Sequence, residues 1–374
     1  MSEPRIRVLI AGGGVAGLEA LHGLHALAGA RVELTFIAPH DEFVYRPLAI
    51  EKPYGVGRIR KVPMTQAADQ AGADLLAGTL ESVDPEHKVV KTSDGTQVEY
   101  DALLLAVGAT PVAVVPNAIT WDDRADSEII GGLMQDIDEG YGHSLAVVIP
   151  PGPGWPLRGY ELALLIAIQA KSMSADHQTT LVVPQPAPLD VLGPRAAESV
   201  ANELEKAGVT VVSANSVEME RGHTTTLVLH PSGQRIEVGR VLALPALRGR
   251  PIPGIPTDEN GFIAVDEHCR ALGLDGVWAA GDGTAFPLKS GGFAVEQADV
   301  AARDIAATAG AAVETRPFDP RAREELAGLP AGRFLNAQIA MDDEEGLTTA
   351  LESTDVPLLT YLSRDLSAGW RGES

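Results

Sequence analysis

The residues best suited to chemistry in this sequence are three glycines near its start, spaced as Gly12-x-Gly14-x-x-Gly17. Gly12 permits a tight turn, Gly14 lets the backbone approach a pyrophosphate, and Gly17 allows a following helix to pack closely. The first amides of such a helix, with their partial positive charge, favour a bound phosphate. The pattern predicts a dinucleotide site that also includes Val15 and Ala16.

The segments around these glycines have the hydrophobic patterns of a strand, a helix and a second strand. Residues 7–11 contain a short apolar run after Arg7, residues 18–28 are rich in alanine and leucine, and residues 31–37 alternate polar and apolar side chains over most of their length. A glycine loop between a strand and a helix is the context that the dinucleotide pattern requires. A glycine-rich turn without a ligand is the alternative, and the context argues against it.

The same order recurs later in the chain. Residues 144–149 form an apolar run that leads into prolines and glycines, and residues 161–170 fit a helix. Another strand, helix and strand are predicted over residues 179–183, 196–207 and 209–212. The recurrence predicts a second nucleotide-type fold.

Composition limits the class of protein. The 374 residues exceed the roughly 250–300 at which one hydrophobic core stops growing, so we expect more than one domain. The formal net charge of −22 repels phosphate backbones, which argues against nucleic acid as a partner. Glycines interrupt the first apolar run, and no stretch of about 18 apolar residues occurs. We therefore expect a cytoplasmic protein without stable membrane insertion.

Two more segments, together with the glycine loop, match the pattern of a known family. Residues 100–111 read Tyr-Asp-Ala-Leu-Leu-Leu-Ala-Val-Gly-Ala-Thr-Pro, and residues 276–284 read Gly-Val-Trp-Ala-Ala-Gly-Asp-Gly-Thr. The chain thereby resembles the FAD proteins of the pyridine nucleotide-disulfide oxidoreductase superfamily. Within it, the chain looks most like the branch of sulfide:quinone oxidoreductases and flavocytochrome c sulfide dehydrogenases.

The resemblance implies FAD as the cofactor and suggests which residues bind it. The middle segment of the family crosses beside the flavin nucleotide, and the aspartate of the last segment, here Asp282, hydrogen-bonds the ribityl chain. The residues so implied are Ala106, Val107, Gly108, Gly281 and Asp282.

A lysine-containing segment of that branch has a counterpart at residues 286–293. In the family a helix N-terminus at this place faces the pyrimidine end of the isoalloxazine ring. By this resemblance, Lys289 and the amides near Gly291 and Gly292 stabilise negative charge on the reduced flavin. A solvated surface lysine is the alternative for Lys289, because lysines are mostly exposed.

The end of the second strand departs from the family pattern. An acidic residue there usually holds the adenosine ribose, but Ala38 takes that position and Pro39 follows it. Residues 43–48 resemble the aromatic and proline stretch that runs along the FAD, which implies contacts by Arg46 and Pro47. An exposed ion pair with a neighbouring carboxylate is an equally good interpretation of Arg46.

The second glycine-containing loop departs from an NAD(P) site. It carries Pro150, Pro151, Pro153 and Pro156, and proline removes the amide donors that a phosphate needs. In the branch named above, the corresponding loop is likewise not an NAD site. Direct reduction by NAD(P)H is therefore disfavoured, although the sequence leaves it open.

Sulfur and metal chemistry lack their usual residues. Cys269 is the only cysteine, so the chain has no internal dithiol pair, and we interpret it as a packed core thiol. The histidines show none of the spacings typical of metal ligands, so no metal site is predicted.

No side chain identifies the reaction. Lys289 and Glu161 are weak candidates for a catalytic role, and Glu161 and Glu296 are acid or base candidates that fit ordinary helix positions equally well. The side chains expected on the substrate side are Trp155, Arg158, Tyr160 and Phe293.

Two functions stay open at this point. The first is an FAD-dependent oxidoreductase that takes electrons from a small donor and passes them to a quinone, an electron carrier or dioxygen. The second is a non-catalytic flavin-binding scaffold or sensor that acts through a protein partner, because fold does not determine function. A homodimer is compatible with either.

The resemblance implies an α/β fold of two Rossmann-like, three-layer ββα-type dinucleotide-binding domains. The FAD domain is expected at residues 1–112 and 273–312, with the second nucleotide-binding-like domain inserted at 113–272 and a small C-terminal segment at 313–374. Composition and periodicity alone do not predict this split.

Overall fold

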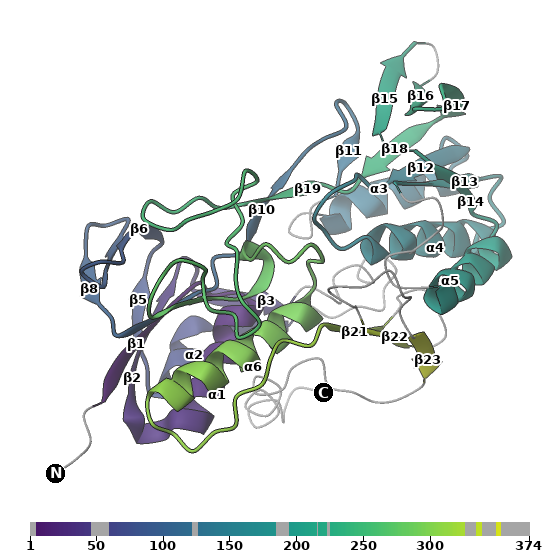
Figure 1. Cartoon of the computed structure of the whole chain (residues 1–374). Helices are drawn as coiled ribbons and strands as arrows, with labels where there is room; N and C mark the ends of the chain where they lie inside the picture. Colours follow the sequence, from purple (N-terminus) through teal and green to yellow (C-terminus); the bar gives the residue numbers. More distant parts are fainter. Residues whose placement is uncertain are drawn as a thin grey trace.

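Two parallel β-sheets, each covered by helices, divide the molecule into two lobes (Figure 1). The computed structural model describes residues 5–45, 60–121, 126–184, 194–214, 216–222, 225–325, 334–338 and 349–352. We refer to the lobe that contains the N-terminal strand as the first lobe and to the other as the second lobe. The arrangement confirms the predicted α/β class with two Rossmann-like folds.

The first lobe is built on a five-stranded sheet in the order β20-β9-β1-β2-β5, in which all neighbouring pairs are parallel. Its strands are β1 (Ile6–Ala11), β2 (Val32–Ala38), β5 (Asp74–Ala77), β9 (Ala102–Leu105) and β20 (Val277–Ala279). The central strand β1 pairs on both sides, with Val8 opposite Leu34 and Ala102. A central parallel strand is covered on both faces, which explains why residues 8–11 are all apolar.

Alternate residues of these strands enter two different cores. Val8 and Ile10 face a helical layer, whereas Leu9 and Ala11 face an antiparallel layer. The helices are α1 (Val15–Ala28), which ends in the short η1 (Gly29–Arg31), α2 (Met64–Ala71) and α6 (Gly291–Thr308). The antiparallel layer consists of β6 (Leu80–Asp84), β7 (Val89–Thr92) and β8 (Gln97–Glu99). The first lobe therefore has the three layers expected of a ββα-type nucleotide fold.

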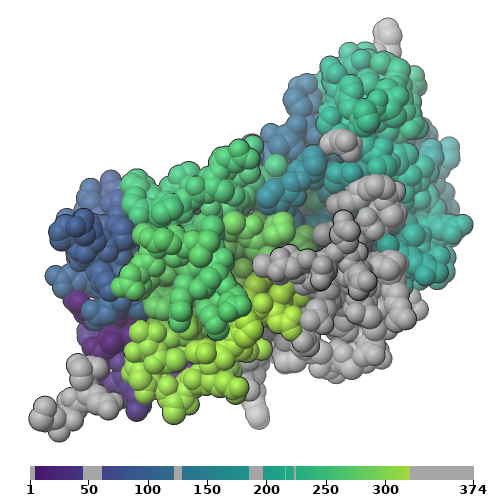
Figure 2. Space-filling view, viewed as in Figure 1, coloured from purple at the N-terminus to yellow at the C-terminus, as the bar shows by residue number. Residues whose placement is uncertain are grey.

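The first lobe is assembled from both halves of the chain. Strand β20 lies beside β9, and α6 packs against α1, although each pair is far apart in sequence. Figure 2 shows purple, blue and yellow-green segments together in this lobe and teal segments in the other.

The second lobe is built on another parallel sheet, in the order β11-β18-β12-β13-β14. Its strands are β11 (Ile119–Thr120), β12 (Ser144–Val148), β13 (Gln178–Val183), β14 (Thr210–Ser213) and β18 (Arg240–Ala243). Its helices are α3 (Asp126–Asp138), α4 (Leu157–Ser172) and α5 (Pro194–Ala207). An antiparallel sheet of β15 (Ser216–Arg221), β16 (Thr225–His230) and β17 (Gln234–Val238) completes it.

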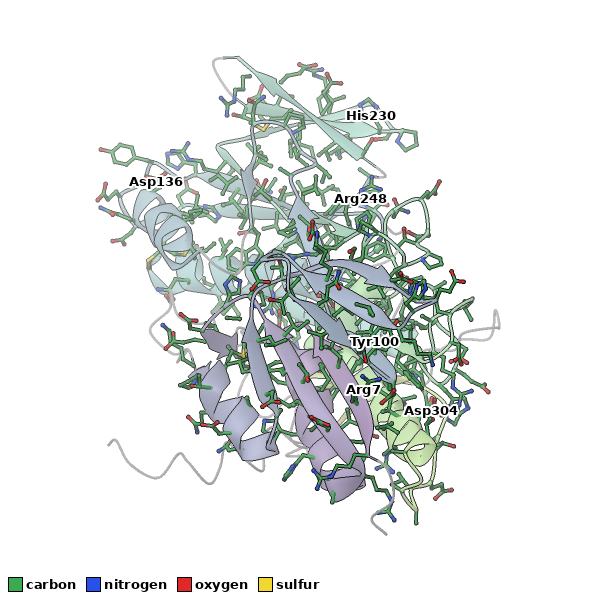
Figure 3. The ribbon with its side chains drawn as sticks, turned by 90° about the vertical axis from the view of Figure 1, so that its left-hand side faces the viewer. Arg7, Tyr100, Asp136, His230, Arg248 and Asp304 are labelled. Carbon is green, nitrogen blue, oxygen red and sulfur yellow. The ribbon has the colours of Figure 1, made fainter. Side chains whose placement is uncertain are left out.

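Two antiparallel strands connect the lobes. Strand β10 (Ala109–Val112) leads out of the first lobe and pairs with β19 (Ala246–Gly249), which leads back. Figure 3 shows Arg248 of β19 between Tyr100 in the first lobe and His230 in the second. The predicted domain boundaries at residues 112, 272 and 312 stay predictions.

The remaining elements are short. Strands β3 (Glu42–Tyr45) and β4 (Arg60–Pro63) form a hairpin-like pair, and an antiparallel sheet comprises β21 (Arg321–Glu325), β22 (Phe334–Gln338) and β23 (Thr349–Glu352). Strand β21 lies near α6 and β23 near α5 (Figure 1). Among the described residues, no helix combines the length and the apolar composition needed to cross a membrane.

Candidate functional site

The predicted cofactor residues gather at one edge of the first sheet. The strands β1, β2, β9 and β20 are parallel, so their carboxyl ends meet there. The amide of Gly12 donates to the Ile37 carbonyl at 2.9 Å, and the amide of Ala106 donates to the Ala11 carbonyl at 2.8 Å. The amide of Ala280 donates to the Leu105 carbonyl at 3.0 Å. Four segments that are distant in sequence thus end side by side.

The geometry around each glycine of the Gly12-x-Gly14-x-x-Gly17 pattern explains in a different way why that position is a glycine. Gly12 has a φ of +127°, and a Cβ there would lie 2.0 Å from the Ala106 carbonyl oxygen. A Cβ on Gly17 would lie 1.8 Å from the Gly12 carbonyl oxygen, so α1 starts close against the loop. A Cβ on Gly14 would meet nothing within 4 Å. The space above Gly14 is open, as the approach of a pyrophosphate requires.

The first turn of α1 faces this open space. Helix α1 begins at Val15. Its N-cap residue, Gly14, has no side chain that could accept hydrogen bonds from the first amides of the helix. The amides of a first turn have no partner within their helix, and together with the helix dipole they favour an anion. Ala16 is buried and Val15 half-buried beside them.

The end of β2 carries an apolar contact where the family usually has an acidic residue. Ala38 is buried. A Cβ built on Gly13 would lie 3.0 Å from the Ala38 Cβ and 2.8 Å from the Met64 methyl group. Methionine and alanine thus cover this side of the glycine loop, and Pro39 is exposed next to them. Arg46 and Pro47 lie outside the described residues.

The predicted turn at Gly281 and Asp282 packs against both other cofactor segments. Gly281 has a φ of +80°, and a Cβ there would lie 3.0 Å from the Cβ of Ala16. A Cβ on Gly283 would lie 3.3 Å from the carbonyl oxygen of Gly108. Gly281 and Gly283 are buried, and Asp282 between them is partly exposed. The carboxylate of Asp282 is therefore the polar side chain that this turn presents at the sheet edge.

Lys289 is buried, which excludes the interpretation of a solvated surface lysine. Its side chain is 5% exposed, its Nζ donates to the Thr284 carbonyl at 2.5 Å, and Nζ lies 4.2 Å from the centre of the Phe262 ring. Burial lowers the pKa of Lys289 to about 8, against the opposing effect of the Asp282 and Asp258 carboxylates. The structure thus holds an amine that changes charge within the accessible pH range.

Helix α6 begins directly after Lys289. The Ser290 side chain caps it by accepting from the Phe293 amide at 3.4 Å, and Gly291 and Gly292 form its first residues. This N-terminus lies in the first lobe, in the segment where the family resemblance places the pyrimidine end of a flavin.

The proline-containing loop of the second lobe is fastened to the segment before α6. The Gly154 amide donates to the Pro287 carbonyl at 3.0 Å, and the Lys289 amide donates to the Gly154 carbonyl at 3.0 Å. The rings of Trp155 and Phe293 meet edge to face at 5.9 Å between centroids. One loop residue thus forms a backbone bridge between the lobes.

The acid or base candidate Glu161 is held within α4. Its carboxylate pairs with the Arg158 guanidinium at 3.0 Å, and its side chain is 6% exposed. Tyr160 is fully buried, and Glu296 is half-buried on α6. The ion pair with Arg158 is typical of a helix carboxylate beside an arginine and assigns Glu161 no chemical role.

Thiol and metal chemistry find no support among the described residues. Cys269 is buried in a turn with a φ of 62°, and burial raises the pKa of its thiol far above the usual range. Within the described part of the chain, no group of three histidine, cysteine or acidic side chains is arranged to hold a metal ion.

The sequence did not predict the residues that contact or hydrogen-bond the predicted cofactor residues. Met64 lies against the glycine loop, Phe262 against Lys289, and Thr284 and Gln297 bind the Gly281 turn. Met64, Phe262 and Gln297 belong to no motif, and Thr284 only ends the segment 276–284 that carries the family resemblance. Gln297 had one usable signal, because a polar residue in the alanine-rich run of α6 predicts a buried hydrogen bond when its neighbours are core residues.

Comparison with known proteins adds a family. A model described as pyridine nucleotide-disulphide oxidoreductase matches residues 6–304. The ferredoxin–NAD(+) reductase component of the biphenyl dioxygenase system of Paraburkholderia xenovorans is 27% identical over an alignment of 304 residues that covers 76% of this chain and 69% of that protein. An NADH dehydrogenase-like protein of Mycobacterium tuberculosis is 25% identical over an alignment of 299 residues that covers 74% of this chain and 72% of that protein.

A solved structure agrees in fold. The sulfide:quinone oxidoreductase from the hyperthermophilic bacterium Aquifex aeolicus superposes with a TM-score of 0.77 at 16% sequence identity, and the match covers 93% of this chain and 87% of that chain. At this level of identity the similarity concerns the fold alone.

Proposed function

Because the chain belongs to the pyridine nucleotide-disulphide oxidoreductase family, whose members are FAD-dependent oxidoreductases, we propose that it passes electrons from a small-molecule donor to a separate acceptor through bound FAD. The acceptor classes that we propose are a quinone, an electron carrier or dioxygen. We further propose that the reaction uses neither a cysteine pair nor a standard NAD(P) site.

The first lobe fits FAD. Gly14 leaves open space next to the N-terminus of α1, where the pyrophosphate would be held, and Asp282 is partly exposed where the ribityl chain would pass. Lys289 and the start of α6 would place positive charge near the pyrimidine ring. Bound FAD supplies the redox chemistry, while the protein supplies binding, orientation and electrostatics.

The absence of a thiol step is supported by Cys269. A thiol acts as a nucleophile only as the thiolate, and the raised pKa of this buried side chain keeps it protonated at neutral pH. Without a second cysteine, the chain also has no internal disulfide couple.

The observation that carries the proposal about NAD(P) is the backbone bridge at Gly154. A pyrophosphate in such a loop needs free amides, but Pro150, Pro151, Pro153 and Pro156 have none. The Gly154 amide is already bonded to Pro287. The loop therefore connects the lobes at the place where a nicotinamide dinucleotide would need amide hydrogen-bond donors.

NAD(P)H as the donor is the second candidate. Two of the relatives reported above carry NAD(+) or NADH in their names. This alternative would require that amides outside the bridge, such as that of Gly152, donate to the pyrophosphate of NAD(P)H.

Anaerobic reduction of the purified protein tests both candidates. We expect the visible band of the flavin to persist when NADH or NADPH is added and to bleach with a donor of another class, for which sulfide and reduced quinones are the first probes. A Cys269→Ser variant is the matched control, and it should bleach with the same donor at the same rate. Rapid bleaching by NADH or NADPH would overturn the proposed role of the Gly154 loop, and a chain that binds no FAD would overturn the proposal as a whole.

A further inference from the structure

Two buried polar side chains lie behind the Gly281–Gly283 turn, and the sequence analysis assigned neither of them a role. Thr284 is fully buried at the end of the turn, and Gln297 is 1% exposed on α6. A polar group in such a place costs stability unless it is hydrogen-bonded, so its partners show what it does.

The two side chains form a closed set of hydrogen bonds with Gly281. The Gly281 amide donates to Oε1 of Gln297 at 2.8 Å, and Nε2 of Gln297 donates to Oγ1 of Thr284 at 3.3 Å. The Thr284 hydroxyl in turn donates to the Gly281 carbonyl at 3.0 Å. Both backbone polar groups of Gly281 thus bond to side chains, and its carbonyl also accepts from the Thr284 amide at 3.1 Å.

This set of bonds acts on a residue with an unusual backbone conformation. Gly281 has a φ of +80°, a region that glycine adopts about as readily as its mirror image. The turn around it therefore needs an external restraint to keep one conformation. Ala16 and Gly108 lie close to the turn, and Gln297 and Thr284 add directional bonds to it.

We propose that Gln297 and Thr284 are positioning residues that hold the Gly281–Gly283 turn in its FAD-binding conformation before the cofactor binds. Asp282, the partly exposed residue of the turn, is thereby presented to the ribityl chain without rearrangement. The inference rests on FAD being the ligand of the first lobe, as proposed above, but not on which donor or acceptor is used. Preorganisation of this kind raises affinity because less ordering is left to occur on binding.

The test measures FAD release from the full-length protein. In Gln297→Leu the side chain keeps a similar size but loses both bonds, which leaves the Gly281 amide unpaired. We expect FAD to dissociate about tenfold faster, the order of effect of one unpaired buried amide. We also expect the fine structure of the visible flavin band to blur, because the cofactor would sit in more than one arrangement.

Conservative variants should restore the behaviour. Gln297→Glu, protonated in its buried site, keeps an acceptor for the Gly281 amide and one donor for Thr284. Thr284→Ser keeps the hydroxyl that Thr284→Val removes. We expect Gln297→Glu and Thr284→Ser to release FAD within about threefold of the parent rate, and Thr284→Val to follow Gln297→Leu.

A control on the same helix separates positioning from stability. Asp304, seven residues after Gln297 and 3% exposed, accepts hydrogen bonds from Arg270 at 2.6 and 2.8 Å and from Trp278 at 2.8 Å. Asp304→Asn should lower the melting temperature of the protein and leave the rate of FAD release unchanged.

Two results would overturn the inference. One is a Gln297→Leu protein that melts earlier, like Asp304→Asn, yet releases FAD at the parent rate. The second result concerns the case in which Gln297→Leu does not fold. A folded Thr284→Val protein that releases FAD at the parent rate would then overturn the inference. A protein that holds FAD normally but accepts electrons from no donor would contradict only the proposed function.

Discussion

Lys289 shows how a single residue acquires a property that its type does not have at the surface. Its amine is bonded to the Thr284 carbonyl and lies over the Phe262 ring, and burial lowers its pKa to about 8 from 10.5. The unfolded chain therefore binds more protons than the folded chain between these two pH values. Stability should rise with pH across this interval, because folding no longer buries a charge.

The first prediction concerns this pH dependence. In the chain freed of FAD, Lys289→Met should raise the free energy of unfolding, relative to the parent, most strongly below pH 8. The advantage should shrink by roughly 3 kcal/mol toward pH 10.5, in line with the lowered pKa. Urea unfolding at several pH values measures it. Lys88→Met, which removes an amine 3.3 Å from Asp275 with its side chain 40% exposed, is the control for the loss of one lysine outside the core. A pH-independent advantage of Lys289→Met would contradict the account.

At the scale of elements, the site is a consequence of parallel strands. All five strands of the first sheet end at one edge, and the cofactor residues follow four of them, so these residues converge although they come from four parts of the chain. The glycines of the first loop then have different tasks. Gly17 lets α1 approach the loop backbone, whereas Gly14 lies beside open space.

These different tasks give the second prediction. Gly17→Ala would bring a methyl group to 1.8 Å from the Gly12 oxygen, so it should destabilise the protein and abolish FAD binding. Gly14→Ala fits the FAD-free chain, since Gly14 already has a φ of −89° and a ψ of −171°. It should leave the melting temperature nearly unchanged and weaken FAD binding by at least about tenfold, because the methyl occupies the place of a close backbone approach. Normal FAD binding by Gly14→Ala would mean that the pyrophosphate lies elsewhere.

At the scale of the whole molecule, several contacts among the described residues join the two lobes. The paired strands β10 and β19 form the covalent connection, and the Gly154 bridge with the Trp155 and Phe293 rings forms a second contact beside Lys289. The entire chain also carries a formal charge of −22, which acts on any charged partner at long range.

The third prediction follows from this charge. After anaerobic reduction, reoxidation by the anion ferricyanide should accelerate as ionic strength rises, because salt screens the repulsion. Reoxidation by the cation hexaammineruthenium(III) should slow under the same conditions. Stopped-flow measurement between about 10 and 300 mM salt, over which the Debye length falls severalfold, compares the two. Equal salt dependence for both reagents would show that the net charge does not govern access to the flavin.

The amino-acid sequence by itself determined the strands and helices next to the two glycine-containing loops and the class of cofactor. The spacing of Gly12, Gly14 and Gly17 and the apolar runs around them are local patterns, and local patterns are set by backbone geometry over a few residues. The same is true of the prolines at residues 150–156, whose missing amides can be read from the sequence.

Only the tertiary structure decided the environment of each side chain. The burial of Lys289, the bonds from Gln297 and Thr284 to Gly281, and the bridge from Gly154 to Pro287 join segments that are distant or on different elements. Such contacts depend on how α6 packs against α1 and how the lobes meet, and no residue spacing encodes them. Solvation and hydrogen bonding are set by these neighbours, so the charge of an amine and the conformation of a turn follow from the packed fold.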